Sequence, residues 1–266
     1  MTSVFLLRSN VLRSVPVPTS PEPSIPDTTG NPSLTSEPHR RIPEATVGRL
    51  PVYQRILEEL LRSGTTTVSS ELLGSLARVN AAKVRKDLSL LGSFGTRGAG
   101  YDTAFLVAQI DRELGLNHVW PMVIVGIGNL GRALAHSQGF IARGFQVMAL
   151  LDTDPTVIGE EIGDVVVRHF DALPDIVADQ SLAIGVIATP ASAAQGVADL
   201  LVESGVHSLL NFAPKVLTVG PEILLRYVDL SIELQIMSFY QSRRSIPGSE
   251  VMPVIRSIGL TSANLD

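Results

Sequence analysis

The feature of this chain that most constrains its fold is a glycine-rich turn between an apolar run and a helical stretch. Residues 122–125 are predicted to form a buried strand, and the chain continues as Gly126-Ile127-Gly128-Asn129-Leu130-Gly131 into a helix predicted over residues 132–138. In such a turn the first glycine allows the tight bend, the second admits a pyrophosphate, and the third lets the helix pack against the strand. The pattern predicts a dinucleotide-binding βαβ unit.

An acidic residue at the end of the next apolar run indicates which dinucleotide is bound. Residues 145–151 are predicted to form a strand that ends on Asp152, about 20 residues after Gly131. A carboxylate at this position accepts hydrogen bonds from ribose hydroxyls and repels a 2′-phosphate. Because Thr153-Asp154-Pro155 supplies no arginine, we expect the ligand to be NADH or NAD+ and not the phosphorylated forms.

Alternating strands and helices continue beyond this unit. Strands are predicted over residues 182–188 and 208–211, with a helix over residues 191–204 between them. The second half of the chain is therefore predicted to be a doubly wound α/β domain with a parallel sheet, in which loops at the strand ends line the cofactor crevice. The candidate contacts in these loops, for which ordinary turn chemistry is an equal alternative, are Thr189, Pro190, Asn211 and Phe212.

Residues that could catalyse hydride transfer are not recognisable. No tyrosine is followed four residues later by lysine, and the HExxH and GxSxG motifs do not occur. The absence of cysteine excludes thiolate metal sites, disulfides and thiol nucleophiles, and it suits a reducing cytoplasm. No apolar run approaches the roughly 18 residues of a membrane span. We therefore expect no metal site and no membrane segment, and a dinucleotide that is sensed and not consumed.

The charge of the chain is divided between two regions. Residues 40–101 hold ten basic and five acidic residues, whereas residues 102–266 hold nine basic and eighteen acidic residues, so the net charge of -5 conceals a basic segment. An ordinary solvated surface is one explanation for this segment. A polyanionic partner is the other.

Three helices are predicted within the basic segment, over residues 50–63, about 70–79 and 81–91. Ser69 or Ser70 is a suitable N-cap for the second helix, whose predicted buried residues are Leu72, Leu73 and Leu76, and Asn80 is a suitable N-cap for the third. The third helix places Val84, Leu88 and Leu91 on one side and Ala82, Arg85, Lys86 and Ser89 on the other. A tight turn followed by a helix with a basic exposed face is typical of a helix-turn-helix that enters the major groove of DNA.

The glycine-rich segment after the third helix resembles the wing of a winged helix. Residues 92–101 contain four glycines and one arginine, Arg97, which is suited to a minor groove. A small helical bundle with a basic face and a flexible loop is the alternative. The expected DNA contacts in this part of the chain are Lys83, Arg85, Lys86, Ser89, Arg97, Gly98 and Tyr101.

Several motifs together resemble the Rex family, the bacterial redox-sensing transcriptional repressors. The resemblance covers roughly residues 42–244 and rests on Ser69-Ser70-Glu71-Leu72, Val84-Arg85-Lys86-Asp87-Leu88-Ser89, Gly95-Thr96-Arg97-Gly98, Gly100-Tyr101, the glycine-rich turn and Asn211-Phe212-Ala213-Pro214. It implies a homodimer that represses respiratory and fermentative genes by binding double-stranded operator DNA. It also implies release from that DNA by NADH, with NAD+ competing.

The resemblance also assigns roles to individual residues. Arg85, Lys86 and Ser89 would face the major groove and Arg97 the minor groove. Arg55 and Asp229 match an intersubunit pair that responds to the cofactor. Relatives commonly carry a tyrosine where this chain has Ser137, and this departure concerns the NADH selectivity and the size of the switch.

The predicted domain organisation follows from these assignments. Residues 1–41 form a proline-rich disordered tail, residues 42–118 a winged-helix domain and residues 119–228 a Rossmann domain. Residues 229–245 form a helix with apolar residues on more than one face, which suits either a core helix or, as the resemblance implies, a helix swapped between subunits. Residues 246–266 have no assignment. The alternative functions are an NAD-dependent dehydrogenase with an appended DNA-binding module and a structural DNA-binding dimer that holds a nucleotide for stability.

Overall fold

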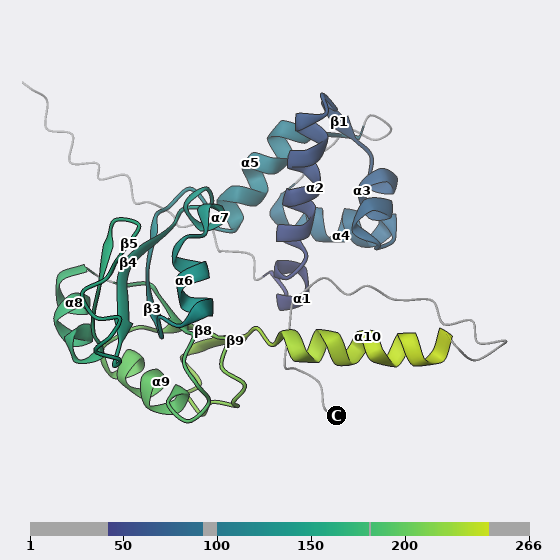
Figure 1. Cartoon of the computed structure of the whole chain (residues 1–266). Coiled ribbons are helices and arrows are strands. Elements are labelled where there is room, and N and C mark those ends of the chain that lie inside the picture. The colour runs from purple at the N-terminus through teal and green to yellow at the C-terminus, as the bar shows by residue number, and fades with distance from the viewer. Residues whose placement is uncertain (1–41, 93–99, 181, 245–266) are drawn as a thin grey trace, which may run out of the picture. The chain divides into compact units, whose positions relative to one another are not determined.

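The computed structural model describes residues 42–92, 100–180 and 182–244 (Figure 1). The buried hydrophobic side chains fall into one cluster drawn from residues 42–114 and two drawn from residues 122–225. The chain therefore builds an N-terminal helical region and a C-terminal α/β region, each with its own core. The predicted N-terminal and C-terminal tails and Arg97 and Gly98 lie outside the described residues.

The N-terminal region is a helical bundle with a short antiparallel pair of strands. Its elements are α1 (Glu44–Val47), α2 (Leu50–Arg62), β1 (Thr67–Val68), α3 (Ser70–Ala77), α4 (Ala81–Leu91), β2 (Tyr101–Asp102) and α5 (Thr103–Glu113). The three predicted helices correspond to α2, α3 and α4. Both predicted N-caps are confirmed, because Ser69 Oγ accepts a hydrogen bond from the amide of Leu72 at 3.1 Å and Asn80 Oδ1 accepts one from the amide of Lys83 at 2.7 Å.

The predicted buried stripe of α3 is wrong at two of its three positions. Leu73 is fully buried, but Leu72 and Leu76 are 42% and 48% exposed. The helix instead turns Gly74 toward the start of α4, where an added Cβ would lie only 2.7 Å from the carbonyl oxygen of Val79. This close approach of the two helices through a glycine determines which face of α3 is buried.

The C-terminal region contains a seven-stranded sheet. Its strands are β3 (Trp120–Val125), β4 (Phe145–Asp152), β5 (Glu161–Ile162), β6 (Val165–His169), β7 (Ile184–Ile187), β8 (Ser208–Asn211) and β9 (Leu224–Tyr227). The spatial order is β5-β6-β4-β3-β7-β8-β9, and all neighbouring strands are parallel except the pair β5 and β6. Leaving β5 aside, this is the strand order of the Rossmann fold, so the predicted doubly wound sheet is confirmed.

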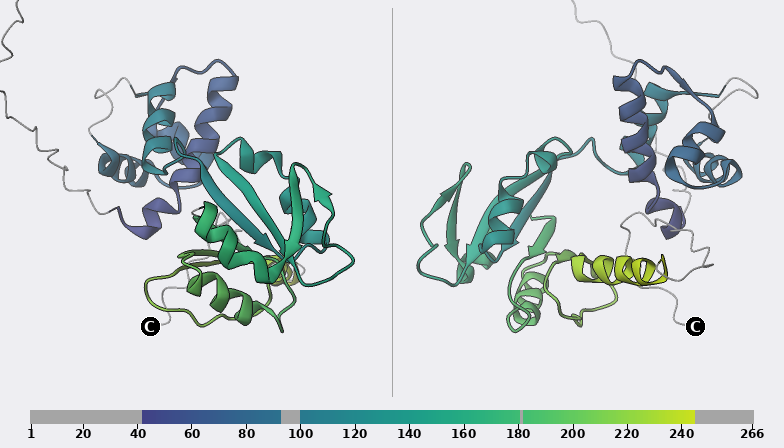
Figure 2. Two further views of the ribbon diagram at one scale, coloured as in Figure 1. Left: turned by 90° about the vertical axis from the view of Figure 1, so that its left-hand side faces the viewer. Right: turned by 45° about the vertical axis from the view of Figure 1, so that its right-hand side comes forward.

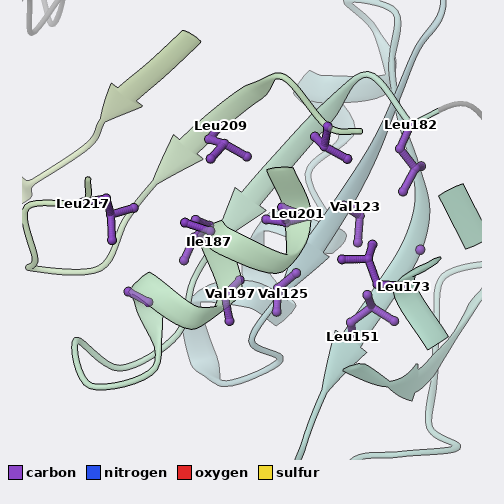
Figure 3. Close-up of a cluster of buried hydrophobic side chains, with 14 of the residues drawn as sticks. Val123, Val125, Leu151, Leu173, Leu182, Ile187, Val197, Leu201, Leu209 and Leu217 are labelled. Atoms are coloured by element: carbon purple, nitrogen blue, oxygen red, sulfur yellow. The ribbon is translucent and has the colours of Figure 1, made fainter. Parts of the chain in front are cut away.

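Helices cover both faces of this sheet. The helices α8 (Leu173–Gln180) and α9 (Ala194–Glu203) pack with Val123 and Val125 of β3 in a single cluster, part of which is drawn in Figure 3. The other face carries Met122 and Ile124, and α6 (Asn129–Ala135) and α7 (Gln138–Ile141) contribute to its cluster. The alternation of β3 residues between two apolar layers explains why this strand is an uninterrupted apolar run.

The helix predicted over residues 132–138 is misplaced. In the structure α6 begins at Asn129, inside the glycine-rich turn, and ends at Ala135. The preceding Gly128 is extended, with φ of -74° and ψ of -163°, so the helix begins directly after it. A separate short helix, α7, follows Ser137.

The last described element is α10 (Leu230–Arg244), drawn in yellow in Figure 2. Its large apolar side chains are between 39% and 66% exposed, namely Leu230, Ile232, Leu234, Ile236, Met237 and Phe239. A helix with this many exposed apolar residues is not a core helix of its own chain. The alternative that residues 229–245 form a core helix of their own chain is therefore wrong.

Candidate functional site

The crevice of the Rossmann sheet lies where the central strands β3 and β7 end. These strands are paired in register from Met122 and Ile184 to Val125 and Ile187. The chain leaves β3 toward α6 on one face and leaves β7 toward α9 on the other, which is the topological switch point where open α/β sheets bind ligands. The glycine-rich turn and Thr189 follow these two strand ends.

The three glycines of the turn occupy three different environments. Gly126 has φ of +97° and lies against Ala188 and Thr189, where a side chain would clash. An added Cβ on Gly131 would lie 1.9 Å from the carbonyl oxygen of Gly126, whereas one on Gly128 would meet nothing within 4 Å. Gly126 and Gly131 are thus needed for the turn itself, and Gly128 leaves an open space beside exposed backbone that a ligand can approach.

The other members of the turn differ in exposure. Ile127 is buried among the side chains of the sheet, while Asn129 and Leu130 are exposed. The side chain of Ile127 is therefore not available to a ligand.

Asp152 is tied to the glycine-rich turn. Its Oδ2 accepts a hydrogen bond from the amide of Ile127 at 2.6 Å, and its Oδ1 accepts from the amides of Thr153 at 2.7 Å and Asp154 at 2.9 Å. A carboxylate offers about four acceptor positions, so the group retains capacity for a hydroxyl. These three bonds hold it in one orientation at the end of β4.

Thr189 presents the observation that fits a ligand best. Its Oγ1 is buried and has no hydrogen-bond partner among the described residues. Buried hydroxyls are normally paired, so an orphaned one beside a crevice suits a partner supplied by a bound ligand. The neighbouring Pro190 is exposed.

The predicted contacts at the end of β8 have structural partners. Asn211 is buried, its Oδ1 accepts from the amide of Ala213, and its Nδ2 donates to the carbonyl oxygens of Ala213 and Lys215. Phe212 is half-buried and packs against the α6 side of the sheet. Asn211 therefore shapes its own loop, and its amide group is already engaged there.

Two charged residues near the end of β4, Arg132 and Glu160, were not predicted from the sequence. Arg132 Nη1 lies 2.5 Å from Glu160 Oε2, and the negative charge of Asp152 also contributes to raising the pKa of Arg132. The pKa of Arg132 is raised chiefly by the bond to Glu160, and the pKa of Glu160 is lowered chiefly by the same bond. Arg132 comes from α6 and Glu160 from the loop before β5, so their proximity is visible only in the fold.

The exposed face of α4 carries the predicted DNA-contact residues that the structure describes. Arg85, Lys86 and Ser89 are exposed and Lys83 is half-buried. Arg85 donates to Ser70 Oγ at 2.8 Å and to Glu71 Oε1 at 2.9 Å, so its guanidinium is held beside α3. Tyr101 is half-buried, and its backbone pairs with Val68 at the end of the segment predicted to be the wing.

A buried polar network on the opposite side of α4 was not predicted. Asp87 is 1% exposed and accepts hydrogen bonds from Arg49 at 2.6 and 2.8 Å, Tyr53 at 2.9 Å and Thr46 at 3.0 Å. Burial opposes the ionisation of Asp87, but the bonds from Arg49, Tyr53 and Thr46 outweigh it and lower its pKa. Burial and the bond to Asp87 raise the pKa of Tyr53. An acid between apolar Val84 and Leu88 was the available signal in the sequence.

The residues predicted to form the switch lie on separate elements. Arg55 is exposed on α2, and Asp229 Oδ1 accepts from the amide and the hydroxyl of Ser231 at 2.8 and 2.6 Å at the start of α10. The ion pairs of the described residues do not include one between Arg55 and Asp229. Ser137 lines a cavity of about 850 Å³ together with His136 and Gln138.

The described residues show neither a metal-binding cluster nor a membrane-spanning helix. Among the described residues, the acidic and histidine side chains do not gather into a group that could hold a metal ion. The helices of residues 42–92, 100–180 and 182–244 are also too short or too polar to cross a membrane.

Comparisons with known proteins agree with this division of the chain. Residues 41–89 match the family described as putative DNA-binding protein N-terminus, and residues 117–215 match the family described as CoA binding domain. The redox-sensing transcriptional repressor Rex of Streptomyces coelicolor is 57% identical over 77% of this chain and 80% of its own length.

Two solved structures resemble the fold. The crystal structure of RSP in complex with β-NAD+ and operator DNA has a TM-score of 0.73 and 34% identity over 77% of this chain and 94% of RSP. The crystal structure of RSP in complex with β-NADH has a TM-score of 0.70 and 34% identity over 75% of this chain and 94% of RSP.

Proposed function

This chain belongs to the Rex family of redox-sensing transcriptional repressors, and from that premise we propose how its two regions act together. The protein binds operator DNA as a homodimer and is released when NADH occupies the Rossmann domain, with NAD+ competing. It acts as a repressor of respiratory and fermentative genes and not as an enzyme. The observation that carries this proposal is that one chain joins a helix-turn-helix with a basic exposed face to a dinucleotide crevice.

DNA binding is assigned to the exposed face of α4. Arg85, Lys86 and Ser89 are exposed on α4, and we assign this face to the major groove. Arg85 is held by Ser70 and Glu71, which restricts the guanidinium before DNA arrives. We assign Arg97 and Gly98 to contacts in the minor groove. Lys83 and Tyr101 are assigned to contacts beside the major groove.

Cofactor binding is assigned to the crevice between the ends of β3 and β7. The open space at Gly128 admits the pyrophosphate to the backbone of the turn, and Asp152 accepts bonds from the adenosine ribose. Thr189 Oγ1, buried and unpaired among the described residues, gains a partner when the dinucleotide binds. Pro190, Asn211 and Phe212 shape the nicotinamide end of the same crevice.

Release from DNA requires that cofactor binding and DNA binding are thermodynamically linked. A ligand shifts an equilibrium only by its differential affinity for the two states, so NADH must favour the dimer arrangement that fits DNA poorly. We assign the switch to Arg55 of one subunit and Asp229 of the other, brought together by exchange of α10. Ser137, in place of the usual tyrosine, sets how strongly the cofactor acts on this pair.

Fluorescence anisotropy of a palindromic operator duplex at fixed salt tests the whole proposal. We expect tight binding without cofactor, release by NADH and little release by NAD+. Binding that ignores both nucleotides would favour a structural DNA-binding dimer. A protein that ignores every candidate operator but turns over a hydride substrate would favour the dehydrogenase.

A pair of arginine variants tests the assignment of the DNA interface. We expect Arg85→Ala to weaken operator binding about 5- to 150-fold, because a bidentate base contact is worth about 1–3 kcal/mol, and to leave NADH affinity unchanged. Arg112→Ala, on α5, removes the same charge from another helix and should leave both affinities nearly unchanged. Equal loss of operator and NADH binding in Arg85→Ala would contradict the division of labour between the two regions.

The location follows from the same proposal. We infer that the protein is cytoplasmic, because a repressor must reach chromosomal DNA and the lack of cysteine suits a reducing compartment.

A further inference from the structure

Three charged side chains gather where β4 ends. Asp152 is the last residue of β4, Arg132 lies on the second turn of α6, and Glu160 lies in the loop that leads to β5. Arg132 Nη1 is 2.5 Å from Glu160 Oε2, and Asp152 is bonded through its Oδ2 to the amide of Ile127 in the turn just before α6. The negative charge of Asp152 also contributes to the raised pKa of Arg132. An arginine is therefore present beside the acid that would receive the adenosine ribose, although the residues directly after Asp152 supply none.

The backbone fixes Glu160 in this place. The amide of Gly159 donates to the carbonyl oxygen of Val167 at 2.9 Å, and the amide of Val167 donates to the carbonyl oxygen of Glu160 at 2.8 Å. Val167 is in turn paired with Leu150 on β4, two residues before Asp152. The backbone of Glu160 is thus hydrogen-bonded to the sheet near the end of β4. These bonds fix the position from which its side chain contacts Arg132.

The partner of Arg132 determines what that arginine can do. Arginines near the ribose accommodate the 2′-phosphate in dinucleotide sites that accept NADP. Here the guanidinium is already bonded to a carboxylate, and the side chains of the pair are 36% and 42% exposed. A phosphate that approached Arg132 would have to displace Glu160 and would also face the negative charges of Glu160 and Asp152.

We propose that Glu160 is a specificity-determining residue that excludes the 2′-phosphate of NADPH by engaging Arg132. The inference rests on the proposed function, in which the adenosine ribose lies at Asp152. Two acids then act together: Asp152 favours the ribose hydroxyls, and Glu160 withholds the neighbouring arginine from a phosphate. Removal of the Glu160 charge converts Arg132 from a neutralised group into a phosphate-binding one.

Titrations of NADH and NADPH into the full chain, followed by cofactor fluorescence, test this role. We expect Glu160→Gln to raise NADPH affinity about 10-fold, or about 1.4 kcal/mol, and to change NADH affinity less than about 2-fold. The matched control is Glu161→Gln, which removes the same charge from the adjacent exposed residue and should leave the NADPH affinity as in the parent. Because the new contact is electrostatic, the gain should shrink as salt rises.

A double variant shows whether the gain passes through Arg132. Adding Arg132→Gln to Glu160→Gln should abolish the gain in NADPH affinity. A gain that persists without the arginine, or a Glu160→Gln variant that binds NADPH no better than the parent, would overturn the role of Glu160. Failure of the parent protein to bind NADH would overturn the proposed function as well, and the NADH titration of the parent separates these two results.

Discussion

At the scale of single residues, the glycines of the turn provide the sharpest test of the cofactor site. Gly128 has an ordinary negative φ and open space around its Cα, so Gly128→Val should fold and fill the space assigned to the pyrophosphate. We expect this variant to bind operator DNA with the affinity of the parent and to lose the response to NADH. Anisotropy with and without NADH measures both properties in one experiment.

Gly131→Val is the informative contrast. Its side chain would begin 1.9 Å from the carbonyl oxygen of Gly126, so the strand and helix must separate. We expect a lower melting temperature for Gly131→Val and a parent-like one for Gly128→Val. If Gly128→Val still leaves the operator on addition of NADH, the crevice is not the regulatory site.

Comparison of these residues shows what the sequence could predict of the site. The places of the glycines and Asp152 in the fold were predictable because they follow from a short local motif whose geometry repeats in many proteins. The Arg132 and Glu160 pair was not, because it joins a helix to a loop after the next strand. The hydrogen bonds of Asn211 to Ala213 and Lys215 were also not predictable. A polar residue at a strand end has the same sequence pattern whether it binds a ligand or the backbone of its own loop.

At the scale of elements, the buried network of Asp87 joins α4 to α1 and α2. Removing one partner of a buried ion pair costs about 3–5 kcal/mol, and Arg49 is partly solvated, so we expect Asp87→Asn to lower the free energy of unfolding at pH 7 by about 3 kcal/mol. Urea denaturation measures this loss. Tyr53→Phe, which removes one donor and keeps the charge pair, should cost about 1 kcal/mol.

The pH dependence of this loss identifies its cause. The folded-state pKa of Asp87 is lowered, so its contribution to stability is complete above the unfolded-state value of about 4 and disappears as the pH falls through the folded value. The difference in stability between parent and Asp87→Asn should therefore be constant from pH 7 to about 5 and shrink below about pH 4. A difference that stays the same down to pH 3 would indicate a packing defect and not the loss of an ionised carboxylate.

Helices and strands were predictable to different degrees. Capping residues and apolar periodicity placed α2 and α4 within a residue or two, because these signals are local. The exposed leucines of α3 were not foreseen, since Gly74 and its approach to Val79 choose the buried face. The edge strand β5 was missed because its two residues are too few to show a period, and β6, β9 and α5 were also not predicted.

At the scale of the whole molecule, α10 exposes more large apolar side chains than any other helix of the described residues. Its exposed leucine and methionine side chains suit burial in a second subunit, where each large apolar side chain contributes about 1.5–3 kcal/mol. We expect Leu234→Asp to weaken the dimer at least about 100-fold, since two copies are lost per dimer, and to weaken operator binding in parallel. Light scattering over a concentration series measures the dimer.

The control for this substitution lies on the same helix. Gln235→Asp places the same charge on the neighbouring exposed position without removing an apolar group, so the dimer should persist. A Leu234→Asp protein that remains dimeric would show that α10 is not the interface.

Linkage provides the strictest test of the molecule as a switch. If NADH weakens operator binding by a given factor, operator DNA must weaken NADH binding by the same factor, because both describe one coupling free energy. Couplings of this kind typically amount to about 1–3 kcal/mol, or about 5- to 150-fold. We therefore expect the operator affinity measured with and without saturating NADH, and the NADH affinity measured with and without saturating operator, to change by equal factors.

A duplex of scrambled sequence should leave NADH affinity unchanged, because the DNA-competent arrangement is then not selected. Unequal factors would mean that a third state, such as a dissociated dimer, takes part, and the dimer series with Leu234→Asp would then identify it.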